Sequence, residues 1–386
     1  MNGNPLLKVY TFGQSIWLDL LRRGMVASGE LERLIDEDGL RGMTSNPTIF
    51  DKAIGGSQDY EEAIRSLTLE GKSVEEIYEA LTLEDVQRAA DEFRPLYERS
   101  QGGDGFVSLE VSPHLAHDTQ RTIVEARRLW QALDRPNVMI KVPATPEGLP
   151  AIRQLTSEGI NVNVTLLFGL PRYRQVADAY IAGLEARAAQ GQPLHHIASV
   201  ASFFLSRIDV LVDPQLEQIM AAGGAKAQLA ERLHGQLAIA SAKVAYQIYG
   251  EILSSERFRR LAERGARAQR LLWASTSTKN PAYSDVKYVE PLIGPDTVNT
   301  VPLETFDAYR DHGNPAPRLQ EGLQEARDML QNLSQLGIDL DQITQQLEDE
   351  GVEKFDRSLD DLMETLRREH AAVLARQPMP AAKERH

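Results

Sequence analysis

The amino-acid sequence predicts an α/β fold in which eight parallel strands close into a (β/α)8 TIM barrel. Eight short apolar runs alternate with segments of helical character along the chain, and this alternation is typical of a parallel sheet covered by helices. The chain has 386 residues, whereas a usual barrel has ~250. We therefore expect inserted helices, mostly between strands 2 and 3 and after strand 6. We expect residues 1–376 to form one barrel domain and residues 377–386 to form a disordered tail.

The first half of the predicted barrel holds four strands. They cover residues 15–21, 42–50, 106–111 and 138–143. Pro47 should break the second of them, because proline cannot donate to a strand ladder. The segment from Ser28 to Asp38 is expected to be a helix capped by Ser28 and ended by Gly39. Residues 60–100 are expected to be largely helical, since two segments there begin with Ser or Thr followed by acidic residues. A further helix is expected at 119–133.

The second half supplies the remaining four strands. They cover residues 160–167, 197–204, 270–275 and 297–301. A short helix is expected at 149–158, with Gly159 after it. A second is expected after the fifth strand and through residue 189, and a long helical region is expected over 225–264. The segment from 319 to 375 is also largely helical in character, and one apolar stripe runs along it, formed by Val352, Phe355, Leu359, Leu362 and Leu366. A stripe at this spacing predicts a C-terminal helix that packs on the barrel.

Composition excludes several classes of function. The chain has no cysteine, which excludes disulfides, thiolate catalysis and cysteine-ligated metals. Its net charge is −14, which argues against nonspecific binding to nucleic acid or to an acidic membrane. No apolar run approaches the ~18 residues of a membrane helix, and the first residues do not resemble a signal peptide. The eight histidines show no spacing typical of metal ligands. We expect a cytoplasmic protein without a metal or cofactor.

Lys141 is an unusual residue because it is a lysine within a short apolar strand. It lies near the end of the apolar strand Val138–Pro143 and shares a face with Met139. Lysine is rarely buried without a partner. Burial disfavours an ammonium group and so favours an amine that can attack a carbonyl carbon. The alternative is a lysine whose stem packs on the core while its charge reaches water.

Further polar residues occur at the C-terminal ends of the other predicted strands. In a (β/α)8 barrel these ends carry the active site. The residues are Asp19, Asn46, Glu110, Asn163, Thr165, Ser202 and the segment from Ser275 to Lys279. Each has an ordinary structural explanation by itself, as a cap, a turn residue or a surface charge. Together they are hard to explain as structure, because burying unpaired polar groups costs ~1–3 kcal/mol each.

This set of residues favours Schiff-base chemistry. Lys141 would form an imine with a ketone. Glu110 with Thr165, acting through a water, would be the acid/base for forming and breaking that imine, and Asp19 would act as the base for carbon–carbon cleavage. A second set would bind the substrate. Asn46, Asn163 and Ser202 would bind hydroxyls, whereas Arg207, at a helix start, and the loop from Ser275 to Lys279 would bind phosphate. The competing interpretation of Arg207 is an arginine on a helix surface, and that of the segment from Ser275 to Lys279 is an ordinary polar loop.

Several segments resemble the transaldolase family, and in particular its longer subgroup. The segments GMTSNPTIF and VMIKVPAT, the latter followed by Glu147 and Gly148, resemble two of the family's signatures. The segments FVSLEVSP, NVNVTLLF and SFFLSRID follow in the family's order, and WASTSTKNPAYSDVKYVEPLIGPDTVNTVP resembles the longer subgroup. The resemblance runs from about Leu7 to Leu374 and so covers nearly the whole chain.

The resemblance implies a (β/α)8 barrel that moves a dihydroxyacetone unit from sedoheptulose 7-phosphate to glyceraldehyde 3-phosphate, as in the non-oxidative pentose phosphate pathway. It implies that Lys141 forms the Schiff base, that Asp19 is the aldol acid/base, and that Phe204 joins the residues lining the pocket. One departure from the family concerns phosphate. Shorter members carry an arginine after strand 7, where this chain has Lys279, and a lysine cannot form a bidentate fork.

Two other functions stay open at this point. A lyase of the fructose 6-phosphate aldolase type would use the same lysine but release dihydroxyacetone. A noncatalytic barrel that binds sugar phosphates would need no reactive lysine. The expected partners are sugar phosphates, with no nucleic acid and no membrane, and the chain is expected to be a monomer or a homodimer.

Overall fold

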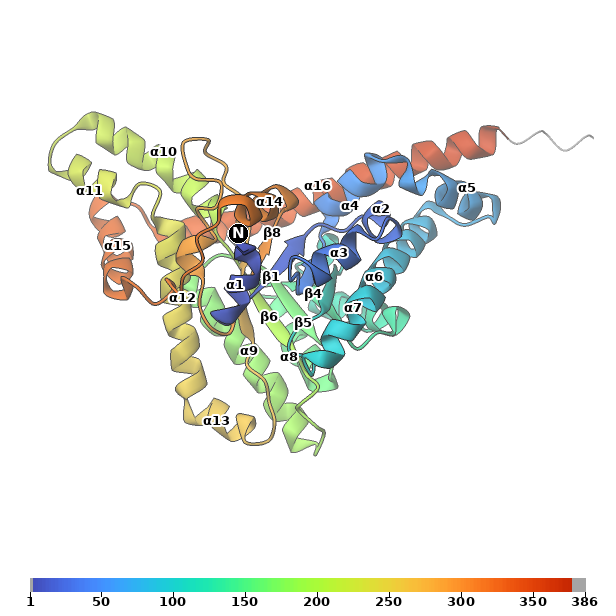
Figure 1. The fold of residues 1–386 in the computed structure, drawn as a ribbon, viewed down its shortest axis with the longest axis horizontal. Coiled ribbons are helices and arrows are strands. Elements are labelled where there is room, and N and C mark those ends of the chain that lie inside the picture. Colours follow the sequence, from blue (N-terminus) through green and yellow to red (C-terminus); the bar gives the residue numbers. More distant parts are fainter. Residues whose placement is uncertain (1–2, 377–386) are drawn as a thin grey trace, which may run out of the picture.

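The computed structural model describes residues 3–376 and confirms the predicted barrel. Eight strands, each parallel to its neighbours, close in chain order, with β8 paired to β1. The strands are β1 Gln14–Asp19, β2 Gly42–Thr44, β3 Phe106–Glu110, β4 Val138–Pro143, β5 Val162–Leu167, β6 Ser199–Phe204, β7 Arg270–Ala274 and β8 Thr297–Val301. Figure 1 shows the sheet at the centre of the molecule with helices around it.

The helices include the expected insertions, α4 to α6 between β2 and β3 and α10 to α13 between β6 and β7. The first group is α1 Pro5–Thr11, α2 Arg23–Ala27, α3 Glu30–Asp36, α4 Pro47–Gly55, α5 Glu61–Leu69, α6 Val74–Arg99, α7 Thr119–Leu133 and α8 Gly148–Glu158. The second is α9 Leu170–Ala189, α10 Ser206–Ala222, α11 Ala225–Leu233, α12 Leu237–Ser254, α13 Glu256–Ala262, α14 Leu303–His312, α15 Leu323–Leu336 and α16 Leu340–Ala375. Short 3-10 turns are η1 Gln58–Tyr60, η2 Pro113–Leu115 and η3 Glu290–Leu292. The predicted tail, residues 377–386, lies outside the described residues.

Two local predictions were wrong. The second strand is only three residues long, and Pro47 begins a helix instead of interrupting a strand. Proline suits the first helical turn, where its missing N–H costs nothing, and the Asn46 side chain accepts a hydrogen bond from the Ile49 N–H at 3.0 Å. The helix expected from Ser28 to Asp38 is present as α3, Glu30–Asp36, but its N-cap is Gly29, with φ 78°, and not Ser28.

The N-terminal end of the barrel is closed by ion pairs and packing. Asp104 accepts a hydrogen bond from the Ser15 hydroxyl at 2.7 Å and pairs with Arg41 at 2.6 Å and Arg270 at 3.2 Å. The two largest buried side chains, Trp17 and Trp273, come from β1 and β7. Residues at this end of a barrel support stability, so we look for function at the opposite end.

Helix α16 crosses that opposite end. Its expected apolar stripe is buried, and Figure 1 shows this long red helix lying across the top of the barrel. Three polar contacts fix it to segments that follow β5, β3 and β2. They join Arg172 to Glu348 at 3.1 Å, His114 to Asp356 at 3.0 Å, and Thr48 to Ser358 at 2.7 Å.

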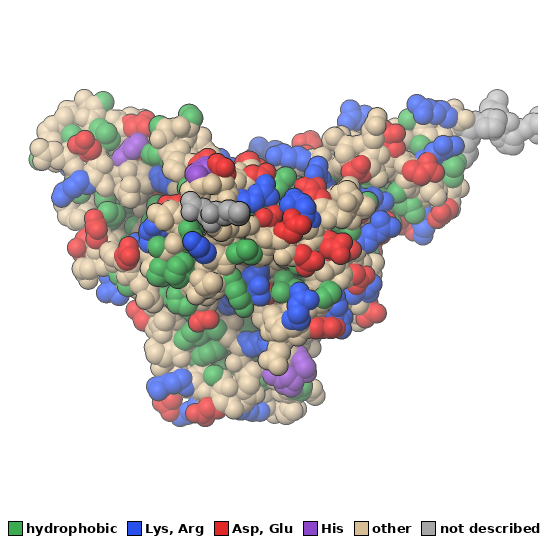
Figure 2. Space-filling view, in the orientation of Figure 1, with side chains coloured by type: hydrophobic (Ala, Val, Ile, Leu, Met, Phe, Trp, Pro, Cys, Tyr) green, Lys and Arg blue, Asp and Glu red, His purple; other side chains and the backbone are tan. Residues whose placement is uncertain are grey.

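Figure 2 shows basic and acidic side chains interspersed over the face of the molecule in view. None of the described helices is both long enough and apolar enough to cross a membrane.

Candidate active site

A cleft of about 520 Å³ opens at the C-terminal ends of the strands. Most of the residues predicted for the site line it. These are Asp19, Asn46, Lys141, Thr165, Ser202, Phe204, Arg207, Ser275 and Lys279. Glu110 and Asn163 do not line the cleft but contact residues of the set from behind it. The structure therefore brings the whole set together, from strands, helix starts and the loop after β7, while the role of each residue stays a prediction.

Lys141 is the central group of the cleft. The parallel register places it directly between Glu110 on β3 and Asn163 on β5. Only 4% of the residue is exposed. Its Nζ lies 3.1 Å from Glu110 Oε2 and donates a hydrogen bond to the Ser45 carbonyl oxygen at 2.9 Å. A buried amine beside a buried carboxylate has a proton acceptor within reach, as a nucleophilic amine requires.

Glu110 and Thr165 are the two groups predicted to handle water. Burial raises the pKa of Glu110, and the charge of Lys141 opposes that rise. Glu110 Oε2 faces the Lys141 amine at 3.1 Å, whereas Glu110 Oε1 and the Thr165 hydroxyl are buried and have no hydrogen-bond partner among residues 3–376. Buried polar atoms are nearly always satisfied, so these two oxygens are suited to bind a water molecule or a substrate group.

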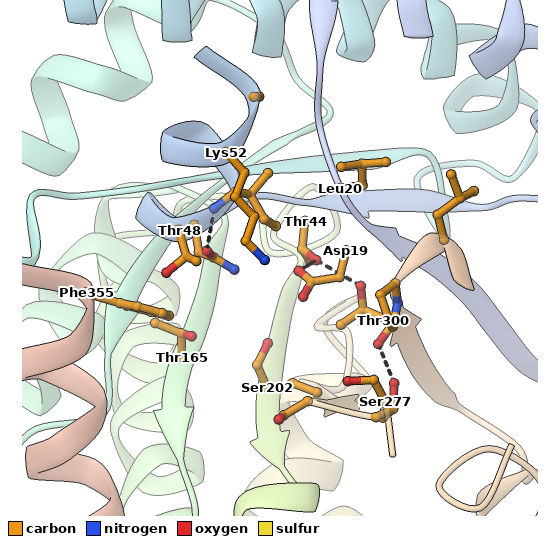
Figure 3. A pocket seen from close by; sticks show the side chains of 18 of the residues that line it. Asp19, Leu20, Thr44, Thr48, Lys52, Thr165, Ser202, Ser277, Thr300 and Phe355 are labelled. Carbon is orange, nitrogen blue, oxygen red and sulfur yellow. Dashed lines mark hydrogen bonds between the residues drawn. The ribbon is translucent and has the colours of Figure 1, made fainter. Parts of the chain in front are cut away.

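Asp19 lies at the end of β1, on the opposite side of the barrel from β5. Its Oδ1 accepts a hydrogen bond from the Thr44 hydroxyl at 2.7 Å, and that hydroxyl is 2.8 Å from the Thr300 hydroxyl. Burial raises the pKa of Asp19, while Lys141 and the Thr44 hydrogen bond lower it. Figure 3 shows Asp19, Thr165 and Ser202 around one cavity. A carboxylate with a raised pKa facing the lysine can act as an acid or a base.

Asn163 and Ser202 belong to one hydrogen-bond chain. The Ser202 hydroxyl donates to Asn163 Oδ1 at 2.7 Å, and Asn163 Nδ2 donates to the Ser108 hydroxyl at 3.0 Å. The chain fixes the orientation of the Asn163 amide beside Lys141. Asn46 is fixed in another way, because its Oδ1 caps α4, which leaves its Nδ2 group available to a ligand.

Cations gather at the outer part of the cleft. Arg207 is the second residue of α10, where the helix dipole also favours an anion, and its guanidinium lies 5.6 Å from the centre of the Phe204 ring. Lys279 follows β7 and contacts the Ser277 hydroxyl. Two further lysines line the same cleft, Lys52 of α4 and Lys354 of α16.

The backbone is strained at two strand ends beside this cluster. Leu166 and Ser275 both have φ 54°, which is unfavourable for a residue with a side chain. The strain at Leu166 coincides with a register shift between β5 and β6, and Ser275 contacts Ser206, the residue before Arg207, at 3.0 Å between hydroxyls. Strain of this kind is retained where the surroundings enforce it, often at functional sites.

Sequence reasoning missed Lys52, Lys354 and Phe355 as cleft residues. The apolar stripe of α16 was interpreted only as packing on the barrel, although Phe355 also lines the cleft and approaches Thr165 in Figure 3. The available signal was Gly351, since a glycine inside a helix often marks a close approach of another segment. For Lys52, the start of a helix at Pro47 would have placed the lysine on that helix.

Among residues 3–376, no group of three or more His, Asp or Glu side chains is arranged to hold a metal ion. The residues that approach one another in the cleft are suited to acid–base, nucleophilic and anion-binding roles.

Comparison with known proteins gives a consistent result. A family model described as Transaldolase/Fructose-6-phosphate aldolase matches residues 16–366. The chain is 50% identical over 372 residues to a transaldolase of Trichodesmium erythraeum, covering 95% of this chain and 97% of the relative. It is 49% identical to a transaldolase of Saccharopolyspora erythraea, covering 92% and 94%. It is also 49% identical to a transaldolase of Thiobacillus denitrificans, covering 92% and 97%.

Proposed function

The chain belongs to the family described as Transaldolase/Fructose-6-phosphate aldolase and is a transferase of the transaldolase type, and from this premise we propose that it moves a dihydroxyacetone unit between sugar phosphates through a Schiff base on Lys141. The donor would be sedoheptulose 7-phosphate and the acceptor glyceraldehyde 3-phosphate. The products would be erythrose 4-phosphate and fructose 6-phosphate.

One observation carries the assignment of Lys141. Its amine is buried at the base of a cleft at the C-terminal end of the barrel, 3.1 Å from a buried carboxylate. A purely structural lysine at a strand end would extend to water. The side chain of Lys141 is only 5% exposed, and Asn163, the residue opposite on β5, is held by hydrogen bonds of its own.

The chemical steps follow from the positions of the carboxylates. The Lys141 amine attacks the ketone carbon C2, and the carbinolamine loses water to give an iminium ion. Glu110 and Thr165, through a bound water, supply and accept the protons of this step. Asp19 then takes the proton of the C4 hydroxyl, the C3–C4 bond breaks, and its electrons enter the iminium group to give an enamine.

Transfer repeats these steps in reverse. The enamine carbon attacks the carbonyl carbon of the acceptor aldehyde, and Asp19 returns its proton to the new hydroxyl. Water then adds to the iminium carbon and frees the amine. Asn46, Asn163 and Ser202 would bind hydroxyls of the dihydroxyacetone fragment, with Phe204 beside them. Arg207, Ser275 and Lys279 would bind the phosphate at the outer part of the cleft.

Borohydride trapping tests this proposal. The protein is incubated with fructose 6-phosphate and sodium borohydride, without added metal, and the adduct is located by peptide mass spectrometry. We expect a reduced three-carbon adduct on Lys141 and none in the Lys141→Met variant. An adduct on a different lysine, or no adduct with active protein, would remove Lys141 from its role.

Release of dihydroxyacetone is the alternative outcome, because the family description includes fructose-6-phosphate aldolase. In a parallel sample without borohydride, the enzyme incubated with fructose 6-phosphate is therefore challenged with erythrose 4-phosphate. Formation of sedoheptulose 7-phosphate faster than free dihydroxyacetone supports transfer. The reverse order would make the protein a lyase.

Three further predictions accompany this proposal. The enzyme would work in the cytoplasm, since its proposed substrates are charged and do not cross a bilayer unaided. It would be a monomer or a homodimer. Residues 1–376 would form one domain, which limited proteolysis can test.

A further inference from the structure

The outer part of the cleft holds more positive charge than the sequence had indicated. Lys52, Arg207, Lys279 and Lys354 come from α4, α10, the loop after β7 and α16, and all four line one cleft. Among residues 3–376, Lys52, Arg207 and Lys354 have no carboxylate within 4.0 Å and donate no side-chain hydrogen bond, whereas Lys279 contacts only the Ser277 hydroxyl. Arg22, which also lines the cleft, pairs with Glu30 at 3.0 Å.

Lys354 lies among like charges. The residue is exposed, but partial burial lowers its pKa, and the charges of Arg207, Lys279, Lys52 and Arg357 lower it further. By contrast, Lys279 is attracted by Glu304 and Asp19, and Glu304 also lines the cleft. Like charges placed together without a counter-ion are unfavourable, so the arrangement around Lys354 is suited to an anion supplied by a ligand.

The position of Lys354 is determined by a close approach of α16 to the barrel. Gly351 lies one helical turn earlier, and a Cβ at this glycine would meet Leu166 Cδ2 at 2.9 Å and lie 3.6 Å from Arg207 Nη1. Leu166 is the strained residue at the end of β5. Residues three and four apart share a helix face, so Gly351 lies on the same face as Lys354 and Phe355, which line the cleft, and Gly351 itself lies against Leu166 and near Arg207.

We propose that α16 is part of the substrate site, and that Lys354, assisted by Lys52, binds the phosphate group of the sugar together with Arg207 and Lys279. Because the two lysines contact only the phosphate end, they determine selectivity for phosphorylated over unphosphorylated substrates. This inference rests on the proposed function and extends it to α16, which the sequence predicted only to pack on the barrel.

The alternative for Lys354 is a solvated lysine on a helix surface, and the two interpretations make different predictions. We would measure kcat/KM with fructose 6-phosphate and with fructose, using the same acceptor. In Lys354→Met we expect the ratio of the two values to fall about tenfold, since a hydrogen bond to a charged group is worth ~1.5–3 kcal/mol and 1.4 kcal/mol is tenfold. The loss should appear in KM more than in kcat, and Lys354→Arg should restore most of it.

Arg357→Met is the matched control. It removes a positive charge one turn further along α16, from a residue that is exposed like Lys354 but does not line the cleft, so the ratio should stay near the wild-type value. If Arg357→Met lowers the ratio as much as Lys354→Met, the effect is one of general charge and the inference is overturned.

Calorimetric titration with inorganic phosphate separates this inference from the proposed function. Wild-type protein should bind phosphate, and Lys354→Met and Lys52→Met should each bind it about tenfold more weakly. Unaltered phosphate binding in Lys354→Met, in a wild type that is active, would overturn the role of Lys354. Phosphate binding that depends on Lys354, in a wild type that forms no adduct on Lys141, would refute the Schiff-base proposal and leave the anion site in place.

Discussion

The contact between Lys141 and Glu110 makes a quantitative prediction about stability. We consider Glu110→Gln, which keeps the volume of the side chain and removes its charge. For two unit charges 3.1 Å apart, Coulomb's law at an effective dielectric constant of ~20 gives about 5 kcal/mol. This is an upper estimate, because burial raises the pKa of Glu110, which shows that the ionised carboxylate itself is costly. Removing one partner of a buried pair typically costs ~3–5 kcal/mol.

We therefore expect Glu110→Gln to lower the free energy of unfolding by about 3 kcal/mol at pH 7. The lower end of the range applies because Lys141 keeps its hydrogen bond to the Ser45 carbonyl. Lys141→Met should cost less than Glu110→Gln, because a carboxyl group whose pKa is already raised can take up a proton when its partner is removed. The double variant should then be more stable than the sum of the two losses predicts.

Urea denaturation followed by circular dichroism would measure this double-mutant cycle. We expect a coupling of at least ~1.5 kcal/mol between the two sites. Losses that add within ~0.5 kcal/mol would show that the two groups do not interact energetically, and the reasoning from the 3.1 Å contact would be refuted. In the same Glu110→Gln protein, kcat should fall by ~10²–10⁴, the usual effect of removing a general acid or base.

Three further predictions concern the proton-transfer carboxylate, the transferred fragment and the fold. Thr44→Val removes the hydrogen bond that lowers the pKa of Asp19. The pKa of Asp19 should therefore rise, and the acidic limb of the kcat/KM profile should move to higher pH. A limb that does not move would exclude Asp19 as the titrating base. Phe355→Ala opens the cleft to water next to Thr165, so we expect more release of dihydroxyacetone per transfer, and an unchanged ratio of products would contradict this. Gly105→Ala places a Cβ 2.7 Å from the Tyr97 backbone nitrogen at φ +85°, and we expect it to lower the free energy of unfolding by ~3 kcal/mol or more. Gly71 has nearly the same φ, +83°, but no neighbour within 4 Å, so Gly71→Ala should cost only ~1 kcal/mol. Equal losses in thermal unfolding of those two variants would show that the clash is relieved elsewhere.

The part of the site carried by strands could be predicted from the sequence. A strand has a side-chain period of two, so the sequence already placed Lys141 on one face of its strand with Met139. Parallel strands in a barrel end at the same side, so Asp19, Glu110 and Thr165 could be assigned to one mouth without knowledge of their contacts. The structure agrees with this part of the prediction to within a few residues at every strand except β2, which ends at Thr44.

The part carried by loops and helices could not be predicted in the same way. Asn46 was expected to lie in a strand interrupted by a proline, but it caps a helix that carries Lys52 into the cleft. The difference is local, because Asn-Pro is compatible with a turn and also with a helix start. For α16 the difficulty is tertiary. A stripe of apolar residues shows that a helix packs on something, but not which end of the barrel it crosses.

The division between these two parts follows the chemistry of the site. The part of the site around Lys141 needs groups held at fixed distances from one carbon atom of the substrate, and the strands of a closed barrel provide that rigidity. A phosphate needs several donors arranged around a larger anion, and these can come from segments far apart in sequence, as Lys52, Arg207, Lys279 and Lys354 do. Substrate selectivity in this barrel should therefore depend on α4, α10, α16 and the loop after β7. If substitutions in those segments altered imine formation at Lys141 as strongly as phosphate recognition, the two parts would be energetically coupled and this separation would be wrong.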